Sequence, residues 1–129
     1  MFNILRPLIF KFSPEVAHSL AIKALKLNNI PYTKPKDNHI LETNFCEKKL
    51  SSPIGVAAGF DKNAEVYNPL FNLGFGFVEV GTITPKPQFG NPKPRVFRLE
   101  EDEALINRLG FNNSGSDEIS KRIKENNKK

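Results

Sequence analysis

The sequence predicts an α/β fold with parallel strands, and three observations in the middle of the chain predict it. Residues 53–58 are a mostly small, apolar run of the kind that forms a buried strand. Residues 64–73 favour a short helix that ends at Gly74, although Pro69 lies inside this helix and is expected to kink it. Residues 77–80 form a second strand. A strand, a helix and a strand with short connections are typical of parallel α/β proteins.

The composition allows one ordinary domain and excludes several kinds of site. The chain has 129 residues, of which 39% are hydrophobic and 26% are charged, and this is enough to bury a core. One cysteine and two histidines cannot build a disulfide framework or a closed zinc site, so we expect no metal. Much of the net charge of +5 lies in residues 121–129. We interpret this segment as a solvated basic end and expect no nucleic-acid partner.

Two amphipathic helices are predicted at the N-terminus. Residues 2–12 place apolar side chains at helical spacing, although Pro7 weakens a continuous helix. Ser13 and Pro14 supply a hydroxyl cap and a proline at the first helical position, and Glu15 suits the positive end of the helix dipole. The second helix carries one apolar stripe, made of Val16, Ala17, Leu20, Ala21, Ala24 and Leu27.

The two helices have two interpretations. Their apolar faces either cover the core of the domain or lie in a membrane interface, with lysine and arginine near the headgroups. Residues 28–39 are polar, contain two prolines and are interpreted as a linker, which places a boundary near residue 38. The longest uncharged run, residues 66–78, is too short and interrupted to span a bilayer, and we expect no secretory signal at the start.

The remaining segments are short. Residues 41–45 alternate like a strand, and residues 47–49 favour a turn. Four prolines stiffen a long loop over residues 84–95. Residues 95–99 alternate like an edge strand, and residues 100–103 form an acidic turn.

The last helix, from Ser116 onward, has only Ile119 and Ile123 as apolar residues, and we expect it to bury little. The chain is therefore expected to stop within a βα repeat, with a parallel sheet of two strands.

Three polar clusters follow apolar segments, at the positions where ligands bind in α/β folds. They are residues 59–62 after the first strand, residues 81–82 after the second, and residues 107–113 after the apolar pair Leu105 and Ile106. We expect the three clusters to converge.

Lys62 has two interpretations. Ala58 and Gly59 let a flat ligand approach the backbone, with the Lys62 ammonium against it. Alternatively, Gly59 only makes a turn and Lys62 pairs with Asp61 or Glu65 on the surface.

The asparagines of the third cluster are also ambiguous. Asn107, Asn112 and Asn113 either hold a planar polar substrate or make turns. His18 lies near the apolar stripe, which favours a helix-face or packed histidine over a ligand.

Four segments resemble, in this order, the membrane-associated, quinone-dependent dihydroorotate dehydrogenases of pyrimidine (UMP) biosynthesis: SPEVAHSLAIKALK, SSPIGVAAGFDKNAE, LGFGFVEVGTITPKPQFGNPKPRVFRL and LINRLGFNN. Four ordered motifs are more specific than any one of them. The resemblance implies that residues 38–129 are the N-terminal part of a flavin-binding (β/α)₈ TIM barrel. It implies that residues 1–37 are a small amphipathic helical element for membrane contact and quinone entry.

The resemblance also implies a reaction and its site residues. Dihydroorotate would be oxidised to orotate, quinone would reoxidise the flavin, and the protein would lie peripherally on the cytoplasmic face of a membrane. The implied FMN contacts are Ala58, Gly59, Phe60, Asp61, Lys62 and Thr82. The implied substrate contacts are Lys62, Asn107, Arg108, Leu109, Gly110 and Phe111. The implied quinone-tunnel positions are His18 and Arg98.

A whole barrel takes roughly 250 residues, so the resemblance implies an incomplete fragment. The base, a serine, is expected downstream, which leaves no catalytic residue in this chain. The alternative function is a non-catalytic truncated product, a peripheral membrane-binding helical module joined to an unfinished α/β segment. A third is a split enzyme in which a separate chain supplies the rest of the barrel.

Overall fold

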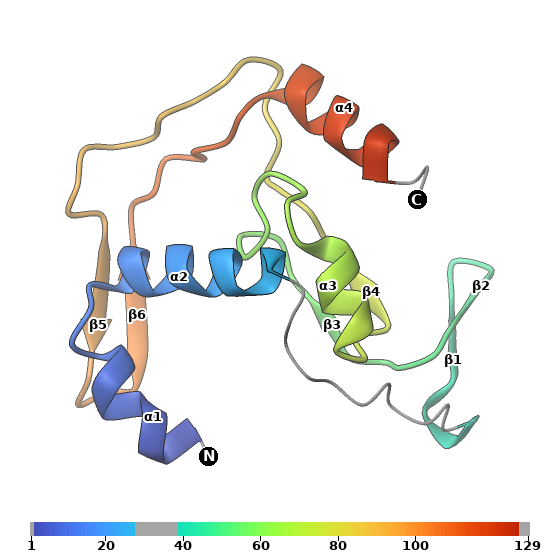
Figure 1. The fold of residues 1–129 in the computed structure, drawn as a ribbon, viewed down its shortest axis with the longest axis horizontal. Coiled ribbons are helices and arrows are strands. Elements are labelled where there is room, and N and C mark those ends of the chain that lie inside the picture. Colours follow the sequence, from blue (N-terminus) through green and yellow to red (C-terminus); the bar gives the residue numbers. More distant parts are fainter. Residues whose placement is uncertain (1, 28–38, 127–129) are drawn as a thin grey trace.

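A computed structural model describes residues 2–27 and 39–126. The predicted linker lies almost entirely outside the described residues. In the described part, the order of elements is two helices, a short hairpin, a β–α–β unit, a second hairpin and a final helix (Figure 1).

The two predicted N-terminal helices are present. Helix α1 spans Phe2–Ile9 and continues through Pro7, which costs it one internal hydrogen bond. Helix α2 spans Pro14–Lys26 and begins as expected, with the Ser13 hydroxyl accepting a hydrogen bond from the backbone N–H of Val16 at 3.4 Å. Figure 1 shows α2 crossing the middle of the molecule, with α1 at one end of it.

The first hairpin follows a 3₁₀ turn, η1, at His39–Leu41. Strand β1 (Thr43–Phe45) pairs antiparallel with β2 (Lys48–Leu50). The turn lies at Cys46 and Glu47, one residue earlier than predicted, and both residues have positive φ, 46° and 62°. A two-residue loop with this backbone matches the twist of the flanking strands, so Lys48 and Lys49 belong to β2.

The predicted parallel unit is confirmed in shorter form. Strand β3 (Gly55–Val56) pairs parallel with β4 (Phe77–Val78), and helix α3 (Tyr67–Asn72) connects them. The helix begins three residues later than predicted because Ala64 has a positive φ of 53°, which is incompatible with a helix. Pro69 is therefore the third helical residue, where its missing N–H has no partner to lose, so the predicted kink does not arise.

The second hairpin corrects one expectation. Strand β5 (Val96–Leu99) pairs antiparallel with β6 (Ala104–Asn107), so Leu105 and Ile106 do not belong to a parallel strand. The four acidic residues between the strands form the turn, as predicted. A connection this short can only return the chain antiparallel, because a parallel crossover needs a dozen residues or more.

The core lies between α2 and the parallel unit. Ile22 and Leu25 of α2 are buried with Val66 and Leu70, and four partly buried residues pack against them: Val56, Phe60, Phe75 and Val78. The predicted stripe on α2 does not face this core. Its largest members, Val16, Leu20 and Leu27, are 47%, 45% and 71% exposed.

Helix α4 (Ser116–Asn126) is anchored more firmly than the sequence suggests. Ile119 is fully buried, which corrects the expectation that this helix buries little. The Arg122 guanidinium also donates a 2.5 Å hydrogen bond to the backbone carbonyl of Asn63. This helix therefore supports the loop that follows β3.

Candidate functional site

Lys62 lies in the loop that follows β3, residues 57–66, which we call the Lys62 loop. The backbone N–H of Gly59 donates to the Gly81 carbonyl at 2.7 Å, and the Gly81 N–H donates to the Asp61 carbonyl at 3.1 Å. These two hydrogen bonds join the Lys62 loop to the segment after β4. Two of the three predicted polar clusters therefore meet at the carboxyl end of the parallel strands.

The Asp61 side chain shapes the Lys62 loop from inside. Asp61 is 1% exposed, and its carboxylate accepts hydrogen bonds from the backbone N–H groups of Glu65 and Val66, both at 2.8 Å. Because these bonds use both carboxylate oxygens, the side chain holds the loop in its turn before α3.

The surface pairing considered for Lys62 is wrong. Its ammonium donates to the Gly59 carbonyl, while the Asp61 carboxylate is occupied and Glu65 pairs with Lys26 at 2.8 Å. Partial burial lowers the pKa of Lys62 below its usual 10.5, because the charged form loses hydration. The negative charge of Glu15 partly opposes this change, and the positive charge of Arg95 adds to it.

The third predicted cluster, residues 107–113, is named here the asparagine loop. It lies against the proline-rich segment 84–95, which we call the proline loop. Asn91 donates from its backbone N–H to the Leu109 carbonyl at 3.0 Å and from its side-chain amide to the Arg108 carbonyl at 2.7 Å. The backbone of the asparagine loop is therefore fixed against the proline loop at Arg108 and Leu109.

Asn113 fixes the far end of the asparagine loop. Its side-chain amide donates to the Thr84 hydroxyl at 2.9 Å and to the Phe111 carbonyl at 2.7 Å. Its side-chain oxygen accepts from the backbone N–H groups of Thr84 and Gly115 at 3.2 and 2.9 Å. This buried residue makes a turn and braces the loop, as the second interpretation of the asparagines predicts.

Asn112 differs from Asn113. Its side-chain oxygen is buried and has no hydrogen-bond partner within the described part of the chain. It lines a cavity of about 290 Å³ together with Lys62, Leu109, Glu15 and His18. The structure thus brings the Lys62 loop, the asparagine loop and α2 to one cavity.

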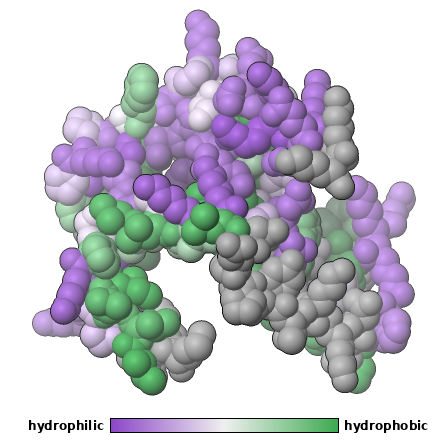
Figure 2. All heavy atoms as spheres, in the orientation of Figure 1, coloured by the Kyte–Doolittle hydropathy of each residue, from purple (hydrophilic) through white to green (hydrophobic). Residues whose placement is uncertain are grey.

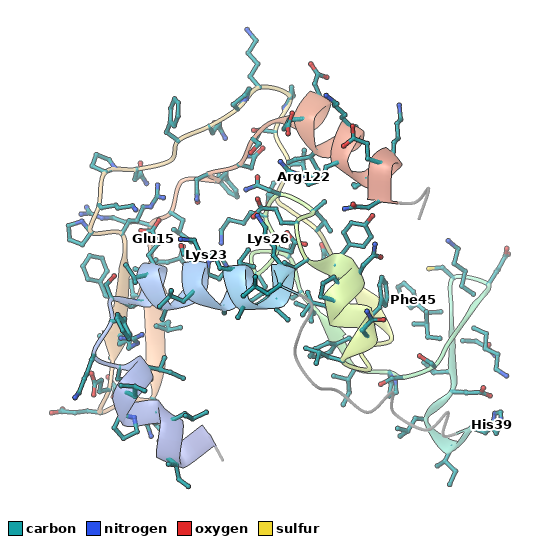
Figure 3. The ribbon with its side chains drawn as sticks, in the orientation of Figure 1. Glu15, Lys23, Lys26, His39, Phe45 and Arg122 are labelled. Carbon is teal, nitrogen blue, oxygen red and sulfur yellow. The ribbon has the colours of Figure 1, made fainter. Side chains whose placement is uncertain are left out.

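Helix α2 presents a polar side to this cavity. Glu15, Lys23 and Lys26 line it and lie on one side of the helix (Figure 3). Ser19 and Ile22 contribute from the same side. The apolar stripe lies on the other side of α2, away from the cavity. This side is exposed unless a further partner covers it.

A second group of predicted site residues forms an open surface beside the cavity. Ala58, Gly59 and Thr82 are exposed at the carboxyl ends of β3 and β4. Gly59 has a φ of 106°, and a Cβ atom added there would meet nothing within 4 Å. Small side chains over open space suit a flat ring that rests against backbone.

The two predicted quinone-tunnel residues hold the N-terminal helices in place. His18 donates from Nε2 to the Phe60 carbonyl at 2.7 Å, which confirms it as a packed histidine. Arg98 donates to the Phe12 carbonyl at 2.7 Å, and its guanidinium lies 4.4 Å from the centroid of the Phe10 ring. One residue therefore connects α2 to the Lys62 loop, and the other connects β5 to the end of α1.

Most of the remaining predicted substrate residues lie on the outside of the asparagine loop. Asn107, Arg108 and Phe111 are exposed, and Leu109 and Gly110 are partly buried. Of these five, Leu109 is the one that lines the cavity with Lys62.

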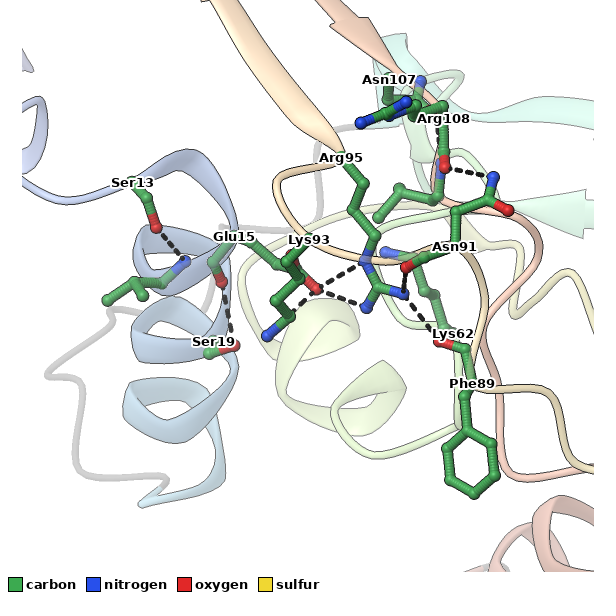
Figure 4. Close-up of polar contacts among 12 residues, drawn as sticks. Ser13, Glu15, Ser19, Lys62, Phe89, Asn91, Lys93, Arg95, Asn107 and Arg108 are labelled. Carbon is green, nitrogen blue, oxygen red and sulfur yellow. Dashed lines mark hydrogen bonds and ion pairs between the residues drawn. The ribbon is translucent and has the colours of Figure 1, made fainter.

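Sequence reasoning missed an ion pair between Glu15 and Arg95. Arg95 is buried and donates to Glu15 at 2.6 Å (Figure 4). The sequence indicated only a helix-dipole role for Glu15 and an edge-strand position for Arg95. No local pattern links two residues that are 80 positions apart.

The comparisons with known proteins decide the family. A family model described as Dihydroorotate dehydrogenase matches residues 40–129. The chain belongs to the dihydroorotate dehydrogenase family. Curated relatives of this family named "Dihydroorotate dehydrogenase (quinone)" are 56% identical over 118 residues in Rhodopseudomonas palustris strain TIE-1 and 51% identical over 124 residues in Erythrobacter litoralis. These alignments cover 91% and 96% of the chain but 32% and 36% of the relatives.

Solved structures of family members agree with this assignment. The ligand-free dihydroorotate dehydrogenase of Eimeria tenella is 49% identical, with a TM-score of 0.83, and the alignment covers 88% of this chain and 31% of that one. The same enzyme in complex with ferulenol gives a TM-score of 0.82. The chain thus spans about a third of the length of the dihydroorotate dehydrogenases it matches.

Proposed function

We propose that this chain carries the quinone-side helices and the first flavin and substrate contacts of a quinone-dependent dihydroorotate dehydrogenase, the first part of a (β/α)₈ barrel. The observation that carries the proposal is the cavity in which Lys62 meets the asparagine loop and α2. The reaction is the oxidation of dihydroorotate to orotate with quinone as the electron acceptor, a step of pyrimidine biosynthesis.

Lys62 is the residue best suited to the substrate. A cation at this position stabilises the carboxylate of dihydroorotate, or negative charge that develops on a ring beside it. The unpartnered side-chain oxygen of Asn112 offers an acceptor for a ring N–H in the same cavity. Asn107, Arg108, Leu109, Gly110 and Phe111 supply further contacts from the asparagine loop.

The open surface at the carboxyl ends of β3 and β4 fits FMN. Ala58 to Lys62 and Thr82 would hold the isoalloxazine ring, because this surface has small side chains, free space and one cation. FMN supplies the hydride acceptor that the oxidation needs. The residues of this chain orient the ring and the substrate. The serine base belongs to the part of the relatives that this chain does not span.

The N-terminal helices are proposed to contact a membrane at its cytoplasmic face and to admit quinone. They belong to a proposed unit of residues 1–37, which precedes the barrel part of residues 38–129. Their exposed apolar residues support this: Ile4, Leu5, Leu8, Ile9, Phe12, Val16 and Leu20. Figure 2 shows this apolar surface over α1 and along α2. Arg6 and Lys11 add positive charge near it, as interfacial helices do. None of the helices in the described part of the chain has the length and apolar character that a membrane crossing requires.

A second candidate function is a membrane-binding product without catalysis. It is favoured by the exposed apolar residues around the parallel unit, among them Ile54, Phe71 and Phe77. A two-stranded parallel sheet leaves such residues without the neighbours that a barrel provides. In a split enzyme, a separate chain would cover them.

The deciding experiment is complementation. The chain is co-expressed with the remaining two thirds of the Rhodopseudomonas palustris relative, and the purified complex is assayed for visible flavin absorbance and for dihydroorotate-dependent quinone reduction. We expect a yellow, active complex that Lys62→Ala inactivates and that the exposed control Lys48→Ala does not. A colourless complex, or full activity with Lys62→Ala, contradicts the proposal.

A further inference from the structure

Arg95 is a buried arginine with an unusually complete set of partners. Its side chain is 8% exposed. Nε and one terminal nitrogen donate to the same oxygen of Glu15 at 3.1 and 2.6 Å. The other terminal nitrogen donates to the carbonyls of Phe89 and Asn91 at 2.7 and 3.0 Å. Figure 4 shows these four hydrogen bonds spreading from one planar group.

The partners of Arg95 belong to two separate structural elements. Glu15 is in the first turn of α2, and Phe89 and Asn91 are in the proline loop. A lysine would not reproduce these four hydrogen bonds, because its ammonium has three donors and no planar fork. The side chain therefore fixes the proline loop against α2.

The proline loop carries this connection to the asparagine loop. Asn91 holds the carbonyls of Arg108 and Leu109, as described above. The Arg95 backbone carbonyl accepts a 2.9 Å hydrogen bond from the Arg108 N–H, and the Arg108 guanidinium donates to Pro94 at 3.1 Å. A continuous path of short contacts thus runs from Glu15 through Arg95 and Asn91 to Leu109.

The ion pair also stands beside Lys62. The hydrogen bond from Arg95 holds the pKa of Glu15 below its usual 4.5, so the carboxylate is charged at neutral pH. Lys93 lies 3.7 Å from the same carboxylate. The charge of Glu15 raises the pKa of Lys62, and the charge of Arg95 lowers it.

We propose that Glu15 and Arg95 are positioning residues, a clamp that fixes the asparagine loop relative to α2. The elements assigned to dihydroorotate and to quinone then move as one unit. The assignment of these two ligands rests on the proposed function, whereas the clamp itself is a property of the described contacts.

A long-range ion pair at the opposite end of α2 provides a matched control. Lys26 and Glu65 lie 2.8 Å apart and also join α2 to a loop. The Lys26 side chain is 46% exposed, and neither residue contacts the proline loop in the interactions described. Glu65→Gln therefore removes the charge that pairs with Lys26 and leaves the Glu15–Arg95 pair unchanged.

The test is hydrogen exchange on the 129-residue chain and its Arg95→Lys, Glu15→Gln and Glu65→Gln variants. The amides of Asn91 and Arg108 report on the clamp, and the amide of Ile119 reports on α4. In Arg95→Lys and Glu15→Gln, we expect the Asn91 and Arg108 amides to exchange about tenfold faster, with Ile119 changed by less than about twofold. Glu65→Gln is expected to leave all three near their original rates.

Three results would overturn the clamp. They are unprotected Asn91 and Arg108 amides in the unchanged chain, equal acceleration of all three amides in Arg95→Lys, and no acceleration of any. These readouts need no flavin and no activity, so a colourless complementation complex defeats the proposed function and leaves the clamp standing.

A kinetic measurement in an active complementation complex tests the link between ligands. Arg95→Lys is expected to raise KM for dihydroorotate and for quinone, each about threefold or more, with flavin absorbance kept. A change in only one of the two KM values rejects the coupling.

Discussion

His18 donates a 2.7 Å hydrogen bond to the Phe60 carbonyl, and the two rings meet edge to face with centroids 5.4 Å apart. This contact joins α2 to the residue that stands two positions before Lys62. The position of Lys62 thus depends on a helix that the sequence separates from it by more than thirty residues.

His18→Phe should loosen this connection. Phenylalanine keeps a ring beside Phe60 but leaves the Phe60 carbonyl without its donor, at a cost of about 1 kcal/mol. Urea unfolding of the chain measures the loss. The control is His39→Phe, which removes an exposed histidine that bonds Glu42 and should change the unfolding free energy by less than about 0.5 kcal/mol. Equal losses in both variants would show that the Phe60 contact contributes nothing particular.

Asp61→Asn should destabilise the Lys62 loop. The buried carboxylate accepts from two backbone N–H groups, and an amide would turn an N–H₂ group toward one of them. Leaving a buried donor without its acceptor costs about 1–3 kcal/mol. Asp117→Asn, at an exposed position in α4, is the matched control. If both variants unfold at the same urea concentration as the original chain, the carboxylate does not hold the loop.

The Glu15–Arg95 pair should make stability fall at acid pH. The pKa of Glu15 is lowered in the folded chain, mainly by the hydrogen bond from Arg95, so the folded state binds this proton less readily than the unfolded state. The stabilisation is then complete above about pH 4.5 and is lost as the pH falls through the lower folded-state pKa. Unfolding free energies measured from pH 6 to pH 3 should decline less steeply in Glu15→Gln. An unchanged slope would exclude Glu15 as a contributor.

Lys62 should lose its proton at a lower pH than an ordinary lysine. Partial burial disfavours the ammonium, so the pKa lies below 10.5. Acetylation with trace reagent between pH 7 and pH 11, followed by mass spectrometry of the peptide, gives the midpoint for this side chain. Glu15→Gln should lower that midpoint further, because the carboxylate supports the charged form. A midpoint at or above 10.5 contradicts the burial argument.

The exposed apolar residues of α1 should bind lipid. Leu8→Glu places a charge in the proposed interface and should reduce cosedimentation with phosphatidylcholine–phosphatidylglycerol vesicles by about tenfold. Phe45→Glu changes another exposed apolar residue, on the first hairpin, which Figure 3 shows far from α1, and should leave binding unchanged. Equal effects of both substitutions would point to general hydrophobic adhesion instead.

Local features of the fold could be predicted from the sequence. The cap at Ser13 could be predicted because it depends only on neighbouring residues. The parallel unit could be predicted from its apolar strand pattern and from Gly74, which follows its helix. The turn at Cys46 and Glu47 could not, because neither residue signals a positive φ. The antiparallel hairpin of Leu105 was predictable in principle, since the acidic turn is too short for a crossover.

The candidate site was predictable in part. The first two clusters follow the parallel strands, which correctly indicated that they would meet. The asparagine loop also reaches Lys62, although it follows an antiparallel strand. Which side of α2 is buried could not be predicted, because Ile22 and Leu25 are selected by contacts with Val66 and Leu70, far along the chain. The Glu15–Arg95 pair could not be predicted either, because its two residues also lie far apart in the sequence.

Helix α2 has polar residues such as Glu15 and Lys23 in the cavity and exposed apolar residues such as Val16 and Leu20 outside it, so the helix separates the cavity from an apolar surface. An α-helix with its side chains is about 10–12 Å across. A hydrophobic electron acceptor resting on the outer side would therefore be separated from the Lys62 cavity by a single helix. Under the proposed function, dihydroorotate and quinone would therefore approach from opposite sides of this one helix.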